Sequence, residues 1–344
     1  MSEINSLPDP EVTIVVSPRE RFSFARESLE SIYEQTEFPF KLVYVSAGSP
    51  RGLDRYLVAK AREKNFALIR TNRYLTPNQA RNLGLAKVKT KYVLFIDNDV
   101  LVLPGWLDAL VRCAEETGAW IVGPLYFKGR PELQIIHMAG GTIRIEEKGG
   151  RRIFHDGHRL TKRHLPEVAG RLQRELCDYV EFHCMMLRNE VFERLGPLDE
   201  KFLNTHEHID ICMAVRRAGG SIYVEPKSAV AYVPPPPFAW SDARFFMLRW
   251  SEKWSQASLC HFEEKWGMVD LNDLNWLRTQ RRRLYKPLLG RLLRLGPLTG
   301  AIRAVLRPVE IALNRFLVRD GGSKIGWEKS ERFSSGIVDG EKEI

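Results

Sequence analysis

The sequence lacks any run of about 18 consecutive apolar residues, the length that a membrane-spanning helix needs. Residues 1–12 contain no basic stretch followed by an apolar core, so we expect no secretion signal. The cysteines are odd in number and form no C-x-x-C pair, which argues against a disulfide framework and a zinc ribbon. They are Cys113, Cys177, Cys184, Cys212 and Cys260. These absences favour a reducing, cytoplasmic setting.

Charge is unevenly distributed along the chain. The 344 residues are 44% hydrophobic and 28% charged, as in an ordinary globular protein, and the net charge is +9. Residues 278–319 contain eleven basic residues and one acidic residue, so the rest of the chain is nearly neutral. A basic segment at one end does not indicate a nucleic-acid-binding domain throughout, and we expect no nucleic-acid partner.

The first 125 residues alternate between short β-branched runs and stretches with helical periodicity. This alternation predicts an α/β fold with a mostly parallel sheet, whose ligands bind at the carboxyl ends of the strands. The expected strands are 12–16, 41–45, 67–70, 91–96 and 119–123, and the expected helices are 24–35, 53–64, 77–87 and 105–117.

The second half of the chain is less regular. Paired glycines between 126 and 175 predict an irregular insertion with some hairpin, a kind of segment that often shapes an acceptor site. A polyproline segment at 234–237 is expected to separate the α/β body from an aromatic-rich helical stretch at 240–268. Between them we expect strand 179–188, helix 189–195, helix 207–218 and strand 221–224.

The most informative triplet is Asp97-Asn98-Asp99, directly after the apolar strand YVLFI. Two carboxylates one residue apart at the end of a strand can place hard oxygen ligands on a divalent cation that neutralises a diphosphate. The triplet alone is equally compatible with a strand-ending turn, because Asp and Asn are common in turns.

The order of several loose motifs resembles glycosyltransferase family 2, the nucleotide-diphospho-sugar transferases of GT-A fold. The resemblance covers residues 12–232 and implies a mixed, mostly parallel sheet flanked by helices, followed here by a helical C-terminal extension. The motifs are VTIVVSPRER at 12–21, Q-T-x-x-P at 35–39, A-R-N-x-G at 80–84, D-x-D at 97–99, V-F-x-x-L-G-x-x-D-E-x-F at 191–202, the acidic motif at 207–210 and R-x-x-G-G at 216–220.

The resemblance implies roles for particular side chains. Asp97 and Asp99 should bind Mn²⁺ or Mg²⁺, with Asp99 the better candidate for direct metal contact. For Arg81 the alternative is a solvated helix face, and for Gly84 close packing of helix on sheet is the favoured role. The side chains expected to contact the donor are Ser17, Arg19, Ser46, Arg81, Asn82 and Asp97.

An inverting sugar transfer needs a base that takes the proton of the acceptor hydroxyl. The candidates are Glu207, His208 and Asp210, and the family usually has Asp where this chain has His208. Glu207 carries a carboxylate, and His208 is chemically able near neutral pH. For Asp210, a helix N-terminal carboxylate favoured by the helix dipole is an equally good interpretation.

Two further departures from the family pattern leave parts of the site open. Ser46 stands where many members have an Asp for the nucleotide base, and Tyr232 stands where many have a metal-binding His. A third protein ligand of the metal is therefore not assigned. Each candidate is also compatible with a structural or acceptor-site role; they are His137, His183, His206, His208 and His261.

The basic C-terminal segment is amphipathic. In 302–316 the apolar residues fall on one arc of a helical wheel and the arginines lie outside it. Residues 287–318 are therefore expected to bind an anionic membrane surface, and the alternative is docking on the protein's own core or on a dimer partner.

Together these patterns predict a metal-dependent, inverting glycosyltransferase that moves a sugar from a nucleotide-diphosphate donor to a glycan or lipid-linked acceptor at the cytoplasmic membrane face. The alternative is a catalytically silent nucleotide-sugar-binding or membrane-binding relative. The expected parts are a tail at 1–11, the GT-A domain at 12–232 with its acceptor-side insertion at 126–175, a helical extension at 233–277, the membrane-association segment at 278–319 and a flexible tail at 320–344.

Overall fold

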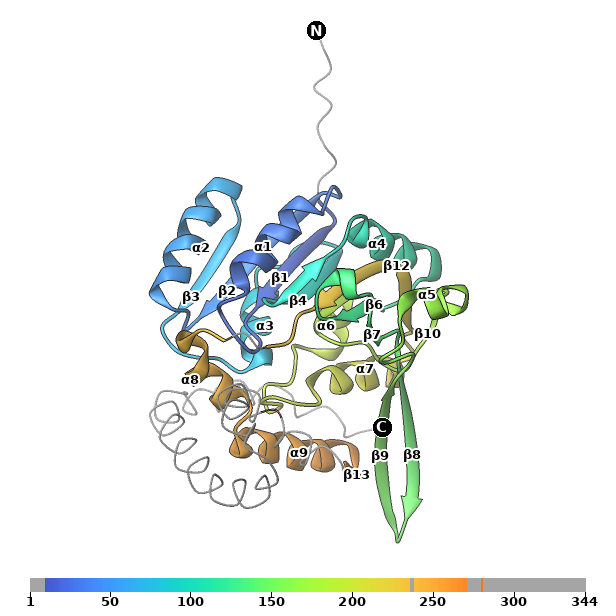
Figure 1. Ribbon diagram of the computed structural model, residues 1–344. Helices are drawn as coiled ribbons and strands as arrows, with labels where there is room; N and C mark the ends of the chain where they lie inside the picture. The colour runs from blue at the N-terminus through green and yellow to red at the C-terminus, as the bar shows by residue number, and fades with distance from the viewer. Residues whose placement is uncertain (1–9, 236–237, 271–279, 281–344) are drawn as a thin grey trace, which may run out of the picture.

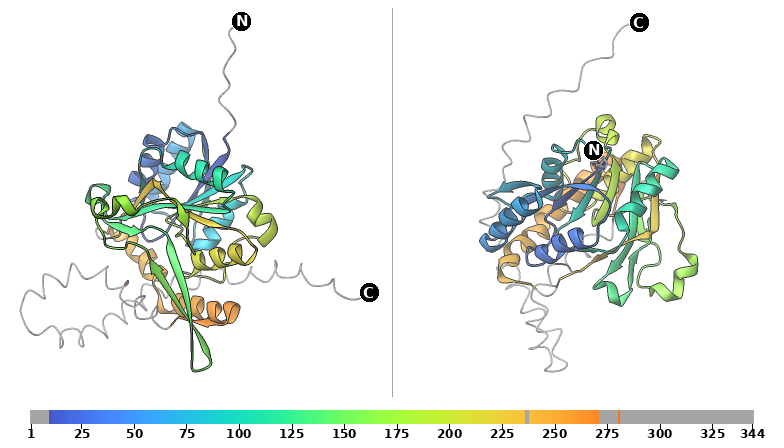
Figure 2. Two further views of the ribbon diagram at one scale, coloured as in Figure 1. Left: turned by 90° about the vertical axis from the view of Figure 1, so that its right-hand side faces the viewer. Right: turned by 90° about the horizontal axis from the view of Figure 1, so that it is seen from above.

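The computed structural model describes residues 10–235, 238–270 and 280, and the expected membrane-association segment, apart from residue 280, and the C-terminal tail lie outside these residues. Within the described part, a central sheet has the strand order β10-β12-β6-β11-β4-β1-β2-β3, with β5 beside β12 and β7 beside β6. Helices cover both faces of this sheet (Figures 1 and 2). The structure is therefore the mixed α/β arrangement that the sequence predicts.

The strands of the central sheet are β1 Val12–Ser17, β2 Phe40–Ala47, β3 Ala67–Thr71, β4 Tyr92–Asp97, β5 Val100–Val102, β6 Ile121–Lys128, β7 Ile136–Met138, β10 Glu175–Leu176, β11 Cys184–Arg188 and β12 Ile222–Tyr232. The helices are α1 Ala25–Glu34, α2 Arg51–Lys64, α3 Pro77–Leu85, α4 Trp106–Thr117, α5 Leu165–Val168, α6 Glu190–Leu195, α7 Glu207–Arg217, α8 Trp240–Arg249 and α9 Glu252–Trp266.

Strands β3, β2, β1 and β4 run parallel, and β11 then enters antiparallel between β4 and β6. Every residue of β1 and β4 is buried, because helices cover both faces of these strands. Their carboxyl ends meet at one edge of the sheet, where Ser17 pairs with Asp97. The expected acidic motif therefore lies where open α/β sheets bind their ligands.

Helix α3 is fixed by a cap at its N-terminus and by close packing on β1 near its C-terminus. Thr76 caps it, Pro77 occupies its first position, and Gln79 completes a capping box. Further along, Gly84 lies so close to β1 that a Cβ there would be 2.2 Å from Cγ1 of Val15. This close approach confirms the packing role expected for Gly84, and it presses the α3 face that carries Arg81 against the sheet edge.

Residues 126–175 are more regular than the sequence predicts. The expected hairpin is present as β8 Gly141–Lys148 and β9 Arg151–His158, which pair along their whole length and project from the body (Figure 1). The short strand β13 Met268–Val269 adds to β9 and makes a second, three-stranded sheet. The Gly149-Gly150 pair, both at positive φ, forms the tight turn of this hairpin rather than an interruption.

The expected strand at 179–188 is wrong in its first half. Only β11 is a strand, and residues 179–183 form a bridge and a turn that still bury Tyr179, Val180 and Phe182. The hydroxyl of Tyr126 holds this turn, since it accepts the amide of Glu181 at 3.2 Å and lies 2.7 Å from the carbonyl of Cys184. A long-range hydrogen bond therefore overrides the local β pattern.

Helices α8 and α9 pack on the carboxyl edge of the sheet (Figure 1). The carboxylate of Asp242 in α8 accepts the backbone amides of Phe22 and Ser23 at 2.8 and 3.0 Å. The ring of Phe245 in α8 lies 5.0 Å from that of Phe22. In the described part of the chain, no helix combines the length and the apolar character that crossing a bilayer requires.

The close approach of α3 to β1 predicts a specific cost for added volume. Gly84→Ala should lower the free energy of unfolding by about 1–3 kcal/mol, since the methyl group would clash with a buried valine. Urea unfolding followed by circular dichroism measures the change. As the control, Gly52→Ala in α2 meets no atom within 4 Å and should be neutral or stabilising by up to about 1 kcal/mol. Equal stability of Gly84→Ala and wild type would refute the packing argument.

Candidate functional site

Asp97 is the fully buried last residue of β4 and is surrounded by cationic and ring nitrogen atoms. Its carboxylate lies 2.9 Å from Nη1 of Arg19, 3.2 Å from Nη2 of Arg81 and 3.2 Å from Nδ1 of His183. Burial alone would raise the pKa of Asp97, but Arg19, His183 and Arg81 together hold it well below its usual range. Asp97 is therefore a carboxylate whose charge the protein itself compensates.

Asp99 has the opposite environment. It is fully buried, and neither of its carboxylate oxygens has a hydrogen-bond partner among the described residues. Burial, together with the charges of Glu20 and Asp97, raises its pKa to about 8. An unpartnered buried carboxyl group is costly unless a cation joins it. Asp97, Asp99 and His183 present ligand atoms within 4.8 Å of one another, so these residues fit a divalent metal ion.

Asn98, between the two carboxylates, fixes the loop after β1. Its Oδ1 accepts the backbone amide of Arg19 at 3.1 Å, and its Nδ2 donates to the carbonyl of Arg21 at 3.0 Å. This pair of bonds brings the guanidinium group of Arg19 over Asp97. This role of Asn98 is not among those expected from the sequence, although its central position in the triplet is a signal for it.

A second buried charge cluster joins α3, α7 and α8. Arg249 donates to Oε1 of Glu207 at 3.0 Å, and Arg81 lies 3.9 Å from the same oxygen. Burial by itself would raise the pKa of Glu207, but Arg249 and Arg81 outweigh burial and lower it. Oε2 of Glu207 has no partner in the described part of the chain. Arg81 is 2% exposed, which excludes the solvated helix face.

The other two expected catalytic residues differ in their surroundings. The His208 ring lies 5.7 Å from that of Tyr179, and burial lowers its pKa to about 4. Asp210 accepts the Nζ proton of Lys265 and the indole proton of Trp266, both at 2.9 Å. Asp210 therefore anchors α9 to α7.

The remaining expected donor-binding residues are not all in the cluster. Ser17 is buried at the end of β1 opposite Asp97, and Ser46 is buried near the end of β2. Asn82 instead bonds a distant loop: its Nδ2 donates to the carbonyl of Leu198 at 2.8 Å, and its Oδ1 accepts the Leu198 amide at 3.0 Å. The Asn82 side chain is thus engaged by Leu198 in the described part of the chain, and donor binding by Asn82 stays a prediction.

Of the histidines considered for the metal, His183 is the one that reaches the acidic motif. Burial and Arg19 lower its pKa to about 4, so its ring is neutral at physiological pH. The ring of Tyr232 stacks on it with centroids 4.0 Å apart. His206 instead lies 3.3 Å from Asp270, and His261 lies 2.9 Å from Asp199. His137 belongs to a neighbouring group described below.

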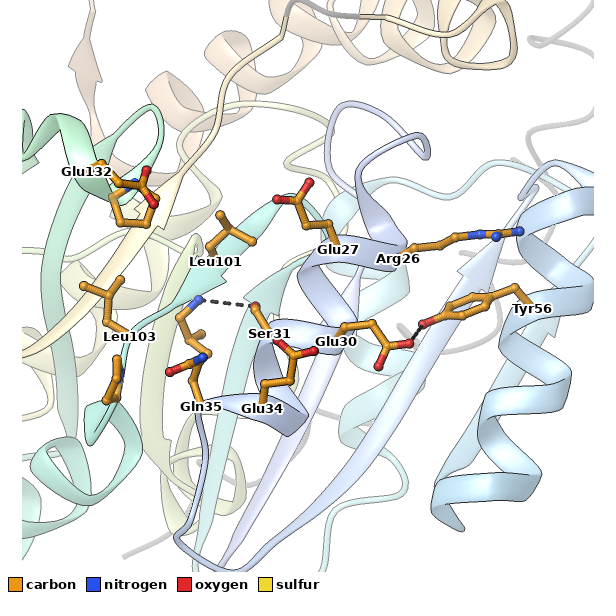
Figure 3. A pocket seen from close by; sticks show the side chains of 13 residues that line it. Arg26, Glu27, Glu30, Ser31, Glu34, Gln35, Tyr56, Leu101, Leu103 and Glu132 are labelled. Carbon is orange, nitrogen blue, oxygen red and sulfur yellow. Dashed lines mark hydrogen bonds between the residues drawn. The ribbon is translucent and has the colours of Figure 1, made fainter.

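An open pocket on another part of the molecule lies between α1, β5 and the segment around Glu132 (Figure 3). Its wall carries Glu27, Glu30 and Glu34 from α1, and the Tyr56 hydroxyl donates to Glu30. None of the expected catalytic, donor-binding or metal-binding residues lines it. The candidate site is therefore the buried carboxyl edge of β1 and β4 and not this pocket.

The raised pKa of Asp99 predicts a pH-dependent cost in the metal-free chain. Between its unfolded value of 3.8 and about 8, the folded chain keeps a proton that the unfolded chain has lost, so stability falls as the pH rises through this window. Each pKa unit corresponds to about 1.4 kcal/mol. Asp99→Asn should therefore exceed wild type by on the order of a few kcal/mol at pH 9 and by much less at pH 5. Urea unfolding in EDTA at pH 5 and pH 9 measures the free energy of unfolding of the two proteins. A stability difference that does not change with pH would contradict the prediction.

Comparison with known proteins agrees with this geometry. Residues 13–196 match the family model of glycosyl transferase family 2. The O-antigen biosynthesis protein RfbC of Myxococcus xanthus is 27% identical over 215 residues, which are 61% of this chain and 16% of that protein. The pre-mycofactocin glycosyltransferase of Mycobacterium tuberculosis is 26% identical over 156 residues, which are 45% of this chain and 30% of that protein. The chain thus spans less than a third of the length of either relative.

Among solved structures, GalNAc-T7 with UDP, GalNAc and Mn²⁺ superposes with a TM-score of 0.50 at 17% identity. The match covers 79% of this chain and 55% of that protein, and at this identity it shows the shared fold alone. Because the family model spans more than half of the sequence, the chain belongs to glycosyl transferase family 2.

Proposed function

We propose that this protein is a metal-dependent, inverting glycosyltransferase that moves a sugar from a nucleoside-diphosphate donor to an acceptor hydroxyl. The observation that carries the proposal is Asp99, which lies next to the compensated carboxylate of Asp97 and whose two buried oxygens have no hydrogen-bond partner among the described residues. Asp97 and Asp99 would hold Mn²⁺ or Mg²⁺ there. Bound to them, the ion would offset the negative charge of the leaving diphosphate.

Unsatisfied guanidinium groups of the same edge support binding of a diphosphate. Nε and Nη1 of Arg249 are buried without a hydrogen-bond partner in the described part of the chain, and Nε of Arg19 and of Arg81 is also buried without one. Phosphate oxygens accept such charge-assisted hydrogen bonds well. UDP is the first nucleotide to test, because the GalNAc-T7 structure of the same fold holds UDP.

Glu207 is the base that the geometry favours. It is ionised at neutral pH because Arg249 and Arg81 lower its pKa, and its Oε2 is available to accept a proton. It also lies next to Arg81, which contacts Asp97, so acceptor and donor chemistry would be adjacent. His208 differs from Glu207 in position, since its ring lies beside that of Tyr179, whereas Glu207 contacts the arginines of the site.

The acceptor is proposed to be a glycan or a lipid-linked saccharide at an anionic membrane surface. The support is the basic, amphipathic sequence of 287–318, which lies outside the described residues. Sedimentation of the full chain with vesicles containing anionic lipid, but not with neutral vesicles, is the expected result; equal sedimentation with both would refute electrostatic attachment.

Donor specificity and metal dependence are tested together. We expect one nucleotide-sugar of a panel, with Mn²⁺ or Mg²⁺, to bind and to release its nucleoside diphosphate, and EDTA to abolish the release. Asp99→Asn should lower the rate by about 100-fold or more, because the metal would lose its least compensated ligand. Donor binding is followed by calorimetry and release by a coupled assay.

The control variant for this experiment is Asp54→Asn, which removes a partly buried carboxylate of α2 that pairs with Arg70 of β3. It should keep full turnover. Binding of a donor without release, even with candidate acceptors present, would favour a catalytically silent relative. Absence of binding to every donor would refute the proposed function.

The base is identified by comparing neighbouring variants. Glu207→Gln should lower kcat by roughly 10²–10⁴-fold while donor affinity changes little, and kcat/KM of wild type should fall as the pH drops toward the lowered pKa of Glu207. His208→Asn should cost less than about 10-fold. A larger loss for His208→Asn than for Glu207→Gln would assign the proton transfer to His208 instead. Analysis of the product anomer by NMR tests inversion.

A further inference from the structure

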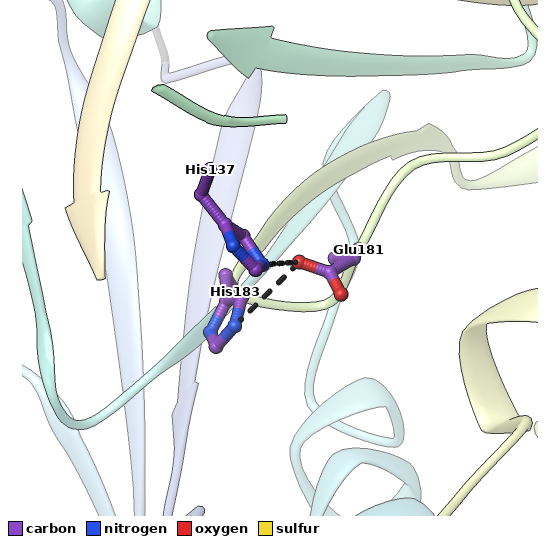
Figure 4. A group of neighbouring side chains, drawn as sticks. All are labelled: His137, Glu181 and His183. Carbon is purple, nitrogen blue, oxygen red and sulfur yellow. Dashed lines mark hydrogen bonds and ion pairs between the residues drawn. The ribbon is translucent and has the colours of Figure 1, made fainter. Parts of the chain in front are cut away.

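Next to the acidic motif lies a second group of ligand-bearing side chains, and none of its contacts is explained by donor binding. His137, Glu181 and His183 present ligand atoms within 4.8 Å of one another (Figure 4). Nε2 of His137 is 2.9 Å and Nε2 of His183 is 3.6 Å from Oε2 of Glu181. On the other side of the same carboxylate, Nε2 of His158 is 3.6 Å from Oε1. Three imidazoles thus converge on one carboxylate.

Separate, well-anchored elements supply these side chains. His137 lies in β7, which pairs with β6, and His158 is the last residue of β9. Glu181 and His183 lie in the turn before β11, whose backbone is held by the hydroxyl of Tyr126. Ligands carried on rigid elements keep their mutual positions without the ion, which lowers the cost of binding it.

The two ring nitrogens of His183 face different groups: Nδ1 faces the acidic motif, and Nε2 faces Glu181. Its Nδ1 lies 3.2 Å from Oδ2 of Asp97, and its Nε2 faces Glu181. A neutral imidazole has one proton and one lone pair. Nη1 of Arg19 also lies 3.2 Å from Nδ1 and donates to it in the tautomer that carries its proton on Nε2. In the other tautomer Nδ1–H donates to Asp97, and the lone pair of Nε2 points to Glu181 and His137. This is the carboxylate–histidine–metal arrangement by which an outer carboxylate orients a metal-binding imidazole.

We propose that His137, His183 and Glu181 form a second metal site, distinct from the Asp97–Asp99 pair, which takes an imidazole-preferring divalent cation such as Zn²⁺. His158 is the nearest further ligand. Two imidazoles and a carboxylate are a common three-ligand set for zinc with a position left open, whereas Mg²⁺ and Ca²⁺ prefer oxygen ligands alone.

The site is buried but can be reached. The side chains of His137 and Glu181 are 16% and 12% exposed, and that of His158 is 22% exposed, whereas His183 on the inner side is 1% exposed. An ion can therefore enter from the side of His137 and His158. Because His183 uses a single lone pair, an ion held by Nε2 leaves the donor-side ion to the two carboxylates, so the two sites share one residue but not one ligand atom.

The test is a titration of the full-length chain, stripped with EDTA, with Co²⁺ as a spectroscopic probe and Zn²⁺ as competitor. We expect one Co²⁺ per chain with the visible absorption of a nitrogen-containing site, displaced by Zn²⁺ and not by millimolar Mg²⁺. His137→Asn and Glu181→Gln should each weaken Zn²⁺ binding by roughly 100-fold or more, since each removes a ligand. Thermal melts of each variant without metal check that it is folded.

Two comparison variants make the assignment specific. His155→Asn removes a histidine that also lies 3.2 Å from a glutamate, Glu146, but has no second imidazole beside it, and it should leave Zn²⁺ affinity unchanged. Asp99→Asn should also keep the Zn²⁺ site. Unchanged Zn²⁺ affinity in folded His137→Asn and Glu181→Gln, or loss of the Zn²⁺ signal in Asp99→Asn alone, would overturn the proposal. Neither readout requires turnover, so failure here is distinguishable from failure of the proposed transferase function.

Discussion

The arrangement of the site depends on how one buried charge, that of Asp97, is compensated. Arg19 approaches it from the loop after β1 and contacts Oδ2, and Arg81 approaches it from α3 and contacts Oδ1. Removing one partner from such a buried ion pair typically costs about 3–5 kcal/mol. The structures that aim these two arginines, the Asn98 bonds to the β1 loop and the close approach of Gly84 to β1, therefore belong to the site as much as to the fold.

Nearby cations compensate Asp97 but not Asp99, so the repulsion between the two carboxylates acts on Asp99. Asp97 stays ionised because cations surround it, whereas burial, Glu20 and Asp97 raise the pKa of Asp99. The two carboxyl groups thus differ in protonation although only one residue separates them, as in other sites where the environment moves two pKa values apart. Asp97 pairs with the arginines of the protein, and Asp99 is the carboxyl group proposed to bind a metal ion from solution.

Much of this could be predicted from the sequence, because the local pattern and the order of motifs carry it. The alternating strands, the acidic triplet and Arg81 follow from periodicity and family resemblance. Glu181 and Arg249 could not be predicted, since each acquires its surroundings through contacts across the chain. Residues 179–183 have a strand-like pattern, and hydrogen bonds of the Tyr126 hydroxyl, from 55 and 58 residues away in sequence, help to hold them in a turn.

Helices α8 and α9, which follow the proline segment in the sequence, contribute side chains to the site. Without α8, Glu207 would keep Arg81 at 3.9 Å but lose Arg249 at 3.0 Å, and its buried charge would be only partly offset. Without α9, Asp210 would lose both Lys265 and Trp266. Each of these pairs joins α7 to α8 or α9. The charge of the proposed base, Glu207, is therefore fully balanced only when the carboxyl edge of the sheet and the helical extension are both folded.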